Sequence, residues 1–128
     1  MSQITTQTLI DELAALRGRV VGMSESVISA TDGLLVAADT STTHPESMAA
    51  LASAALGLGK RTASQSALGQ LVEVVQRCNG GYVVVLPIRE RALLVVIGDE
   101  GLDLPGLRRE SSRSIDTLAA LLDVGSAR

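Results

Sequence analysis

Residues 29–39 read Ser-Ala-Thr-Asp-Gly-Leu-Leu-Val-Ala-Ala-Asp, and the Asp-Gly pair in this stretch decides how the first part of the chain folds. Residues 20–30 mix β-branched residues with small and polar ones, and residues 34–38 form a short apolar run. Asp-Gly between two such runs is typical of a tight hairpin, because glycine accepts positive φ angles without steric strain. The sequence therefore predicts two antiparallel strands that meet at Gly33.

An amphipathic helix is predicted on the N-terminal side of this hairpin. Within residues 5–16, Leu9, Leu13 and Leu16 recur at steps of four and three, while charged residues lie between them. This spacing is the period of a helix that buries one face. We expect the three leucines to face the core.

A second helix is predicted after the hairpin. Thr43 and Glu46 have the spacing of a capping box, and Pro45 falls in the first turn, where its missing N–H is tolerated. Most of the surface outside the apolar stripe carries alanine, serine or glycine, so we expect another element to pack closely on it. The apolar stripe consists of Met48, Leu51, Ala55 and Leu58.

Three more strands are predicted at residues 68–78, 82–86 and 92–97. Polar residues interrupt the first of these runs, and the Asn-Gly-Gly sequence at 79–81 makes a turn before the second. The last two runs are apolar throughout, with a charged segment at 89–91 between them. Strands that are apolar on both faces are usually covered on both faces.

A final helix is predicted from Asp103, which is suited to capping its first turn, to Leu122. The order of elements is then α-β-β-α-β-β-β-α. Five strands joined by hairpins make an antiparallel sheet, which the helices must cover on both faces. The predicted fold class is α/β (α+β): a three-layer sandwich with a five-stranded antiparallel sheet, in one domain over residues 1–128 with its core at about 5–122.

Composition excludes several classes of function. The net charge of −3 offers no excess positive potential to a phosphate backbone, and Tyr82 is the only aromatic residue on which a base could stack. Nucleic acid is therefore not expected as a partner. The N-terminal residues lack the pattern of a signal peptide, and no apolar run reaches the ~18 residues that span a bilayer. We expect a cytoplasmic protein that does not insert into membranes.

Catalytic and metal chemistry find little support in the sequence. His44 is the sole histidine and is expected to cap a helix, so a multi-histidine metal site cannot be built. Cys78 is the only cysteine, which excludes an internal disulfide, and we expect a buried, inert thiol. Asp99, Glu100 and Asp103 lack the spacing of a calcium loop and are expected to form a solvated turn. We expect no cofactor, no metal and no catalytic residue.

The Gly-rich stretch at 57–62 does not satisfy the phosphate-loop motif. Ala54 stands where the motif needs its first glycine, Arg61 stands where it needs serine or threonine, and the stretch is expected to end a helix. We expect Lys60 and Arg61 to interact with the last carbonyl groups of that helix. The charged run at 108–113 is expected to be a solvated helix face, with a docking patch as the alternative.

Three stretches together resemble the roadblock (dynein light-chain type) family, which belongs with the longin-like and profilin-like folds. They are the hairpin at 29–39, the alanine-rich helix at 48–59 and the strand at 81–88. With the first and last helices, the similarity covers nearly the whole chain, and its specificity lies in the order and spacing of these elements. The resemblance extends to actinobacterial members that are associated with a small GTPase and a sensor kinase.

The resemblance implies a homodimer, or a heterodimer with a related domain, in which third strands pair across a two-fold axis and central helices lie side by side. The residues suit this arrangement, because a long unpaired strand at a sheet edge invites pairing and small side chains let two helices approach closely. The expected interface residues are Ala49, Ala52, Ser53, Leu56, Gln70, Val72, Val74 and Gln76.

The resemblance also implies binding and regulation of a Ras-like small GTPase, with a sensor kinase as a further partner. Four cations are candidates for docking that partner: Lys60, Arg61, Arg89 and Arg91. The alternative function is a small-molecule sensing or scaffold domain associated with a sensor kinase, although sensor pockets need convergent polar or aromatic groups that an aliphatic interior lacks.

Overall fold

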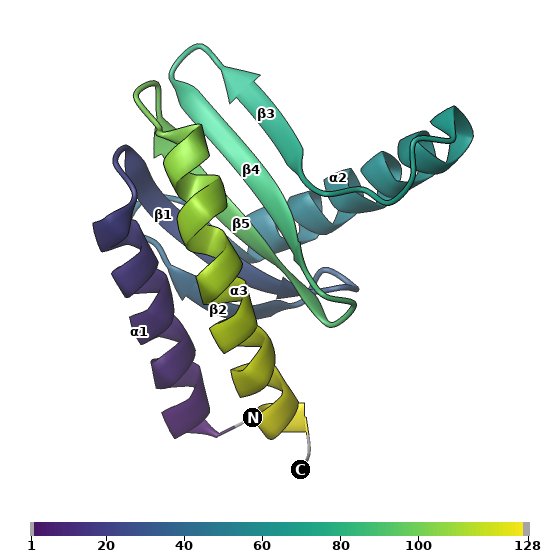
Figure 1. The fold of residues 1–128 in the computed structure, drawn as a ribbon. Helices are drawn as coiled ribbons and strands as arrows, with labels where there is room; N and C mark the ends of the chain where they lie inside the picture. The colour runs from purple at the N-terminus through teal and green to yellow at the C-terminus, as the bar shows by residue number, and fades with distance from the viewer. Residues whose placement is uncertain (1, 127–128) are drawn as a thin grey trace.

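The computed structural model describes residues 2–126, and the predicted order of helices and strands is confirmed (Figure 1). Within this part of the chain, no helix combines the length and the apolar character needed to cross a membrane. The elements are α1 (Gln3–Arg19), β1 (Met23–Ala30), β2 (Leu35–Asp39), α2 (Pro45–Ser66), β3 (Val74–Cys78), β4 (Gly81–Ile88), β5 (Ala92–Asp99) and α3 (Leu104–Ser126).

The five strands form one antiparallel sheet in the order β2-β1-β5-β4-β3. Helices α1 and α3 pack together over one face of the sheet, and α2 crosses the opposite face (Figure 1). The predicted three-layer sandwich is therefore confirmed. Because β4 and β5 lie inside the sheet, between β1 and β3, and helices cover both faces, their sequences are apolar on both faces.

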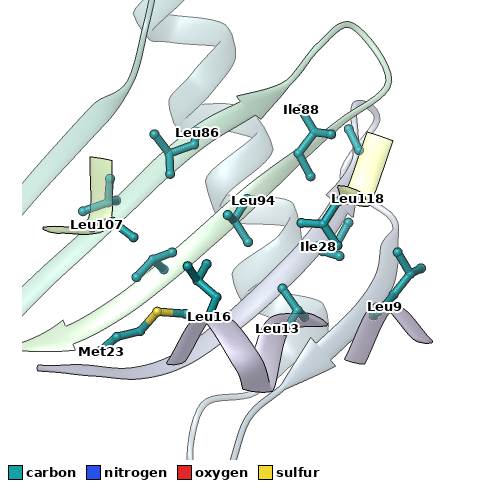
Figure 2. Packing of buried hydrophobic residues seen from close by; sticks show 14 of the residues in the cluster. Leu9, Leu13, Leu16, Met23, Ile28, Leu86, Ile88, Leu94, Leu107 and Leu118 are labelled. Carbon is teal, nitrogen blue, oxygen red and sulfur yellow. The ribbon is translucent and has the colours of Figure 1, made fainter. Parts of the chain in front are cut away.

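The larger core lies between the sheet and the α1–α3 layer (Figure 2). Leu13 and Leu16 of α1 and Leu118 of α3 converge on Ile28 of β1 and Leu94 of β5, and all five side chains are fully buried. Burial of each large aliphatic side chain contributes about 2 kcal/mol, so this cluster is the main source of stability of the domain.

Glycine is required at two of the predicted turns. Gly33 has a φ of 93°, and the neighbouring amide of Leu34 donates to Oδ1 of Asp32 at 3.1 Å, which closes the β1–β2 hairpin. A Cβ atom on Gly81 would lie 2.0 Å from the carbonyl oxygen of Gly98, so no side chain fits where β4 begins. Both turns were predicted from their sequences.

The N-terminus of α2 is capped by His44, one residue later than the capping box predicted at Thr43. The His44 Nδ1 accepts a hydrogen bond from the Ser47 amide at 3.2 Å. Thr43 lies one residue before the cap, and its amide donates to Glu25 at 3.1 Å. Asp103 caps α3 as predicted, since its Oδ1 accepts from the Gly106 amide at 3.0 Å.

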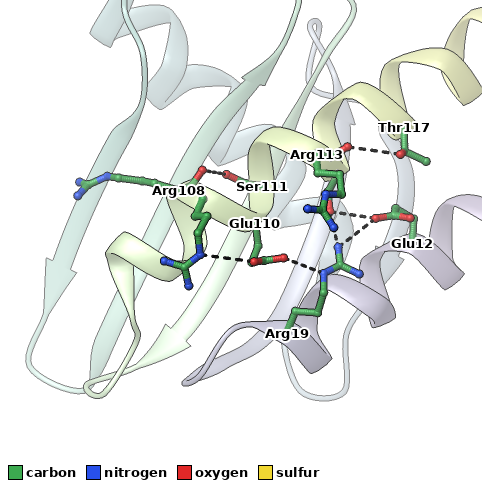
Figure 3. Close-up of polar contacts among 9 residues, drawn as sticks. Glu12, Arg19, Arg108, Glu110, Ser111, Arg113 and Thr117 are labelled. Carbon is green, nitrogen blue, oxygen red and sulfur yellow. Dashed lines mark hydrogen bonds and ion pairs between the residues drawn. The ribbon is translucent and has the colours of Figure 1, made fainter.

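A polar seam joins α1 to α3 on the outside of the molecule (Figure 3). Arg19 donates to Glu110 at 3.1 Å and to Ser114 at 3.0 Å, and the Ser114 hydroxyl donates to Glu12 at 2.9 Å. The prediction of a solvated face at 108–113 therefore holds for the exposed Arg109 but is wrong for Glu110, whose carboxylate is half-buried against α1.

Strand β3 begins at Val74 and not at Leu68 as predicted. Helix α2 continues to Ser66, beyond the 57–62 stretch where it was expected to end. Residues 67–73, which we call the return segment, then lead the chain back to the sheet. They form an apolar run broken by polar residues, which imitates a strand, but they pair with no strand.

Glu25 is a buried carboxylate at the start of β1. It accepts hydrogen bonds from the amides of Ser41, Thr42 and Thr43 and from the Thr42 hydroxyl, the last at 2.7 Å. Burial raises the pKa of Glu25, but the hydrogen bonds from Thr42 and Thr43 lower it more, and the pKa falls to about 2. The loop that leads into α2 is thus held by one ionised side chain.

Glu25→Gln is expected to lower the free energy of unfolding at pH 7 by about 3 kcal/mol. The reason is that the hydrogen bonds around Glu25 stabilise its ionised form in the folded state, as its lowered pKa shows. The folded pKa lies below the unfolded value, so this stabilisation is complete above about pH 4.5 and disappears as the pH falls toward 2. Urea unfolding of the wild type should show this acid-side loss, and the variant should not. The exposed Glu100→Gln is the control, expected to change stability by less than about 0.5 kcal/mol; equal pH profiles for wild type and Glu25→Gln would contradict the assignment.

Candidate interaction surface

The outer edge of β3 is the more open of the two sheet edges. Four of its five residues are exposed, and its hydrogen-bonded neighbour in the sheet is β4 alone. At the opposite edge, β2 is half-buried because both α1 and α2 contact it, and Arg17 of α1 forms an ion pair with Asp39 at 2.7 Å. An exposed edge strand presents unpaired N–H and C=O groups that can bind another strand.

The neighbouring end of β4 is protected from such pairing. Val74 lies opposite Val85, so β3 does not cover residues 86–88 of β4. Pro87 lies in this uncovered stretch, and proline has no N–H to donate to an added strand. The edge that is free to pair is therefore confined to the five residues of β3.

One apolar stripe of helix α2 faces the sheet of the same chain. Ala49, Ala52 and Leu56 are buried in a second core cluster with Val85 and Val95. These three helix residues were expected at a dimer interface, and this placement is wrong because the sheet of the same chain already covers them. The alanines allow α2 to lie close to the sheet, which is the close packing that the composition indicated.

The opposite face of α2 exposes large apolar side chains. Leu51 and Leu58 are 66% and 65% exposed and lie two helical turns apart on one face. Beside them, a groove of about 120 Å³ separates α2 from β3 and β4, and Ala55, Val74 and Gln76 are among the residues that line it. The apolar face of α2 and the open edge of β3 thus form one continuous surface, which we call the α2–β3 surface.

The C-terminal half of α2 extends beyond the sheet (Figure 1). From Gly57 to Ser66 no described side chain is buried, and the helix ends at Ala67, which adopts the left-handed conformation. Gly59 allows the return segment to approach, since a Cβ there would lie 2.9 Å from Leu71. A helix with so little support from its own chain is suited to contact a partner.

Comparison with known proteins identifies the family. The model of the Roadblock/LC7 domain matches residues 9–98. The chain belongs to the Roadblock/LC7 family. The resemblance inferred from the hairpin, the alanine-rich helix and the β4 strand is confirmed.

Solved structures share the fold of this Roadblock/LC7 chain. A Roadblock/LC7 domain from Streptomyces avermitilis superposes with a TM-score of 0.80 at 22% identity, covering 87% of this chain and 94% of that one. MglB, solved in a tetrameric arrangement, gives a TM-score of 0.84 at 16% identity over 94% and 92% of the two chains. Among sequences, an uncharacterized protein of Methanocaldococcus jannaschii is 28% identical over 90% of this chain and 98% of its own length.

The remaining predicted interface residues are distributed over two elements. Val74 and Gln76 lie on β3 beside the groove, whereas Gln70 and Val72 belong to the return segment and not to a strand. Ser53 is half-buried, and its hydroxyl donates to the Thr31 carbonyl of the β1–β2 hairpin at 2.8 Å. Leu51 and Leu58, which the sequence placed in the apolar stripe, were missed as surface residues because periodicity alone does not show which side of a helix faces the sheet.

The four predicted docking cations have different surroundings. Arg89 pairs with Asp116 of α3 at 2.8 Å and Arg91 pairs with Asp123, so each already has an acidic partner although both side chains remain exposed. Lys60 and Arg61 form no ion pair with any residue in the described range 2–126. They lie within α2, not in its last turn as predicted, and therefore do not cap it.

The other chemical groups considered in the sequence do not converge on a site. Cys78 is exposed at the end of β3, so the prediction of a buried thiol is wrong. The three amides of residues 41–43 make a small anion-binding loop at the start of α2, but the carboxylate of Glu25 already occupies it. Over residues 2–126, no three His, Cys, Asp or Glu side chains are placed to hold a metal ion.

Proposed function

We propose that this Roadblock/LC7 domain is a non-catalytic dimeric platform that binds and regulates a Ras-like small GTPase in the cytoplasm. The observation that carries the proposal is the α2–β3 surface, where an unpaired strand edge adjoins an exposed apolar helix face. A second copy of the chain would complete both features at once, since β3 can extend the sheet and α2 can cover apolar side chains.

The symmetry of such a dimer restricts the register of β3. In an antiparallel pair related by a two-fold axis, one residue must lie opposite its own copy. Pairing centred on Gln76 uses all five residues of β3, whereas a shift in either direction leaves residues unpaired. Val74 then faces Cys78 of the second copy on the α2 side of the sheet, and Val75 faces Arg77 on the other side.

The apolar helix faces would meet beside the paired strands. Leu51 lines the groove beside β3, and Leu58 lies two turns further along the same exposed face of α2, so the α2 helices of two copies would approach each other along these residues. The unsupported C-terminal half of each helix would reach past its own β3 toward the second sheet. The exposed outer residues of the two helices, such as Ala54, would form a shared surface for the GTPase.

The assignment of a GTPase as partner rests on the family. Roadblock proteins serve as platforms for Ras-like GTPases, and MglB, which has the same fold, assembles from several copies. The aliphatic α2–β3 surface and the absence of convergent acid–base groups in residues 2–126 favour binding over chemistry. Regulation would then act through the dimer and not through a reaction on this chain.

The register is tested by a cysteine placed on the proposed two-fold axis. In a Cys78→Ser background, Gln76→Cys should form a symmetric disulfide under mild oxidation, because directly opposite residues bring their Cβ atoms within bonding distance. Arg77→Cys in the same background is the control, since its own copy lies two positions away along the strand. Non-reducing electrophoresis should show a covalent dimer for the first variant and little for the second; equal yields, or no dimer with either, would contradict the register.

GTPase binding is tested with a purified bacterial Ras-like GTPase, loaded with GTP or GDP. The wild type should co-elute with the GTP form and change its rate of hydrolysis. Leu58→Asp should abolish both effects, because a carboxylate in the dimer contact separates the two copies. Leu34→Asp is the matched control: Leu34 is 68% exposed but lies on the β1–β2 hairpin. Failure of the wild type to co-elute with either form would refute the proposed partner.

A further inference from the structure

A second hollow lies beneath the C-terminal half of α2. It has a volume of about 690 Å³ and is enclosed by α2, the return segment and the turn between β4 and β5. Ala63, Leu71 and Pro87 contribute apolar lining, and Lys60, Arg89 and Glu90 contribute charged groups. This hollow is distinct from the small groove beside β3, with which it shares no lining residue.

The two hollows lie on opposite flanks of α2. Successive helix residues are about 100° apart, so Lys60 and Ser64 continue the flank on which Ser53 contacts the β1–β2 hairpin. Met48 and Ala55 lie on the other flank and line the groove beside β3. A second copy that pairs through β3 would cover the Met48 flank, on which Lys60 does not lie.

The charges around this hollow favour an acidic ligand. Lys60 is exposed and forms no ion pair within residues 2–126, and Arg89 remains 58% exposed although it pairs with Asp116. Glu90 is the single carboxylate in the lining, and because Asp116 already pairs with Arg89, Lys60 is the cation of the lining that is left for a ligand. Opposite charge placed at the rim of an apolar contact increases both specificity and the rate of association.

We propose that this hollow is a second docking site that takes a segment of the partner protein in which an apolar side chain stands next to an acidic one. The apolar side chain packs on Ala63, Leu71 and Pro87, and the carboxylate pairs with Lys60. Each dimer carries two such sites. The identity of the partner rests on the proposed function, but the chemistry of the segment rests on the hollow itself.

The site is tested with a capped hexapeptide that contains one leucine followed by two aspartates in an alanine and serine background. Amide chemical shifts of the wild-type protein should change in α2 near Ala63 and Ala67 and in the return segment near Leu71. Lys60→Glu should weaken the affinity for this peptide at least about tenfold, because an attractive pair becomes repulsive. Arg61→Glu is the matched control: it makes the same charge change at the next residue, on a different face of α2, and should alter the affinity by less than about twofold.

Two results would overturn the proposal: shift changes that lie outside the hollow, or equal binding of a peptide with lysines in place of the aspartates. No binding of either peptide at millimolar concentration would overturn it as well. Dimer formation is measured separately by the Gln76→Cys cross-link, and co-elution with the GTPase is measured on the wild type. The docking site can therefore fail while the dimeric platform stands, and the platform can fail while the peptide still binds.

Discussion

Strand β3 has a hydrogen-bonded neighbour on one side only, so its outer edge carries unpaired backbone groups. The apolar groove beside α2 borders this open edge. The opposite layer is closed by ion pairs: Arg19 joins α1 to α3, and Arg108 of α3 reaches Glu73 in the return segment at 2.6 Å. At the other sheet edge, Arg17 and Asp39 join α1 to β2. On the face that carries α2, exposed leucines adjoin unpaired backbone groups, and this is where we propose that a partner binds.

Most of the fold was predictable because its turns carry strong local signals. The Asp-Gly and Asn-Gly-Gly sequences fix two hairpins, and the spacing of Leu9, Leu13 and Leu16 fixes the first helix and its buried face. The start of β3 was not predictable, because residues 68–73 continue the same pattern of an apolar run broken by polar residues. Their structure is decided by a contact that is distant in sequence, the packing of Leu71 against Gly59 of α2.

The surface was predictable in kind but not residue by residue. An alanine-rich helix indicates close packing, yet the sequence does not say whether a second helix or the chain's own sheet fills that space. Here the sheet takes Ala49 and Leu56 and leaves Leu51 and Leu58 outside. In the same way, Arg91 reads as a free cation until the fold brings Asp123 beside it. These outcomes depend on tertiary contacts, which local periodicity does not encode.

We thus propose two separate roles for helix α2, one toward a second copy and one toward a partner segment, and the first of these is the basis of the whole interpretation. Sedimentation equilibrium of the unmodified protein over the micromolar range tests it most directly. Completion of β3 by a second copy requires a mass of twice the single-chain value of 13.2 kDa, with dissociation only on dilution. A mass of one chain at every concentration would contradict it, because the open edge and the exposed leucines would then persist unpaired in solution.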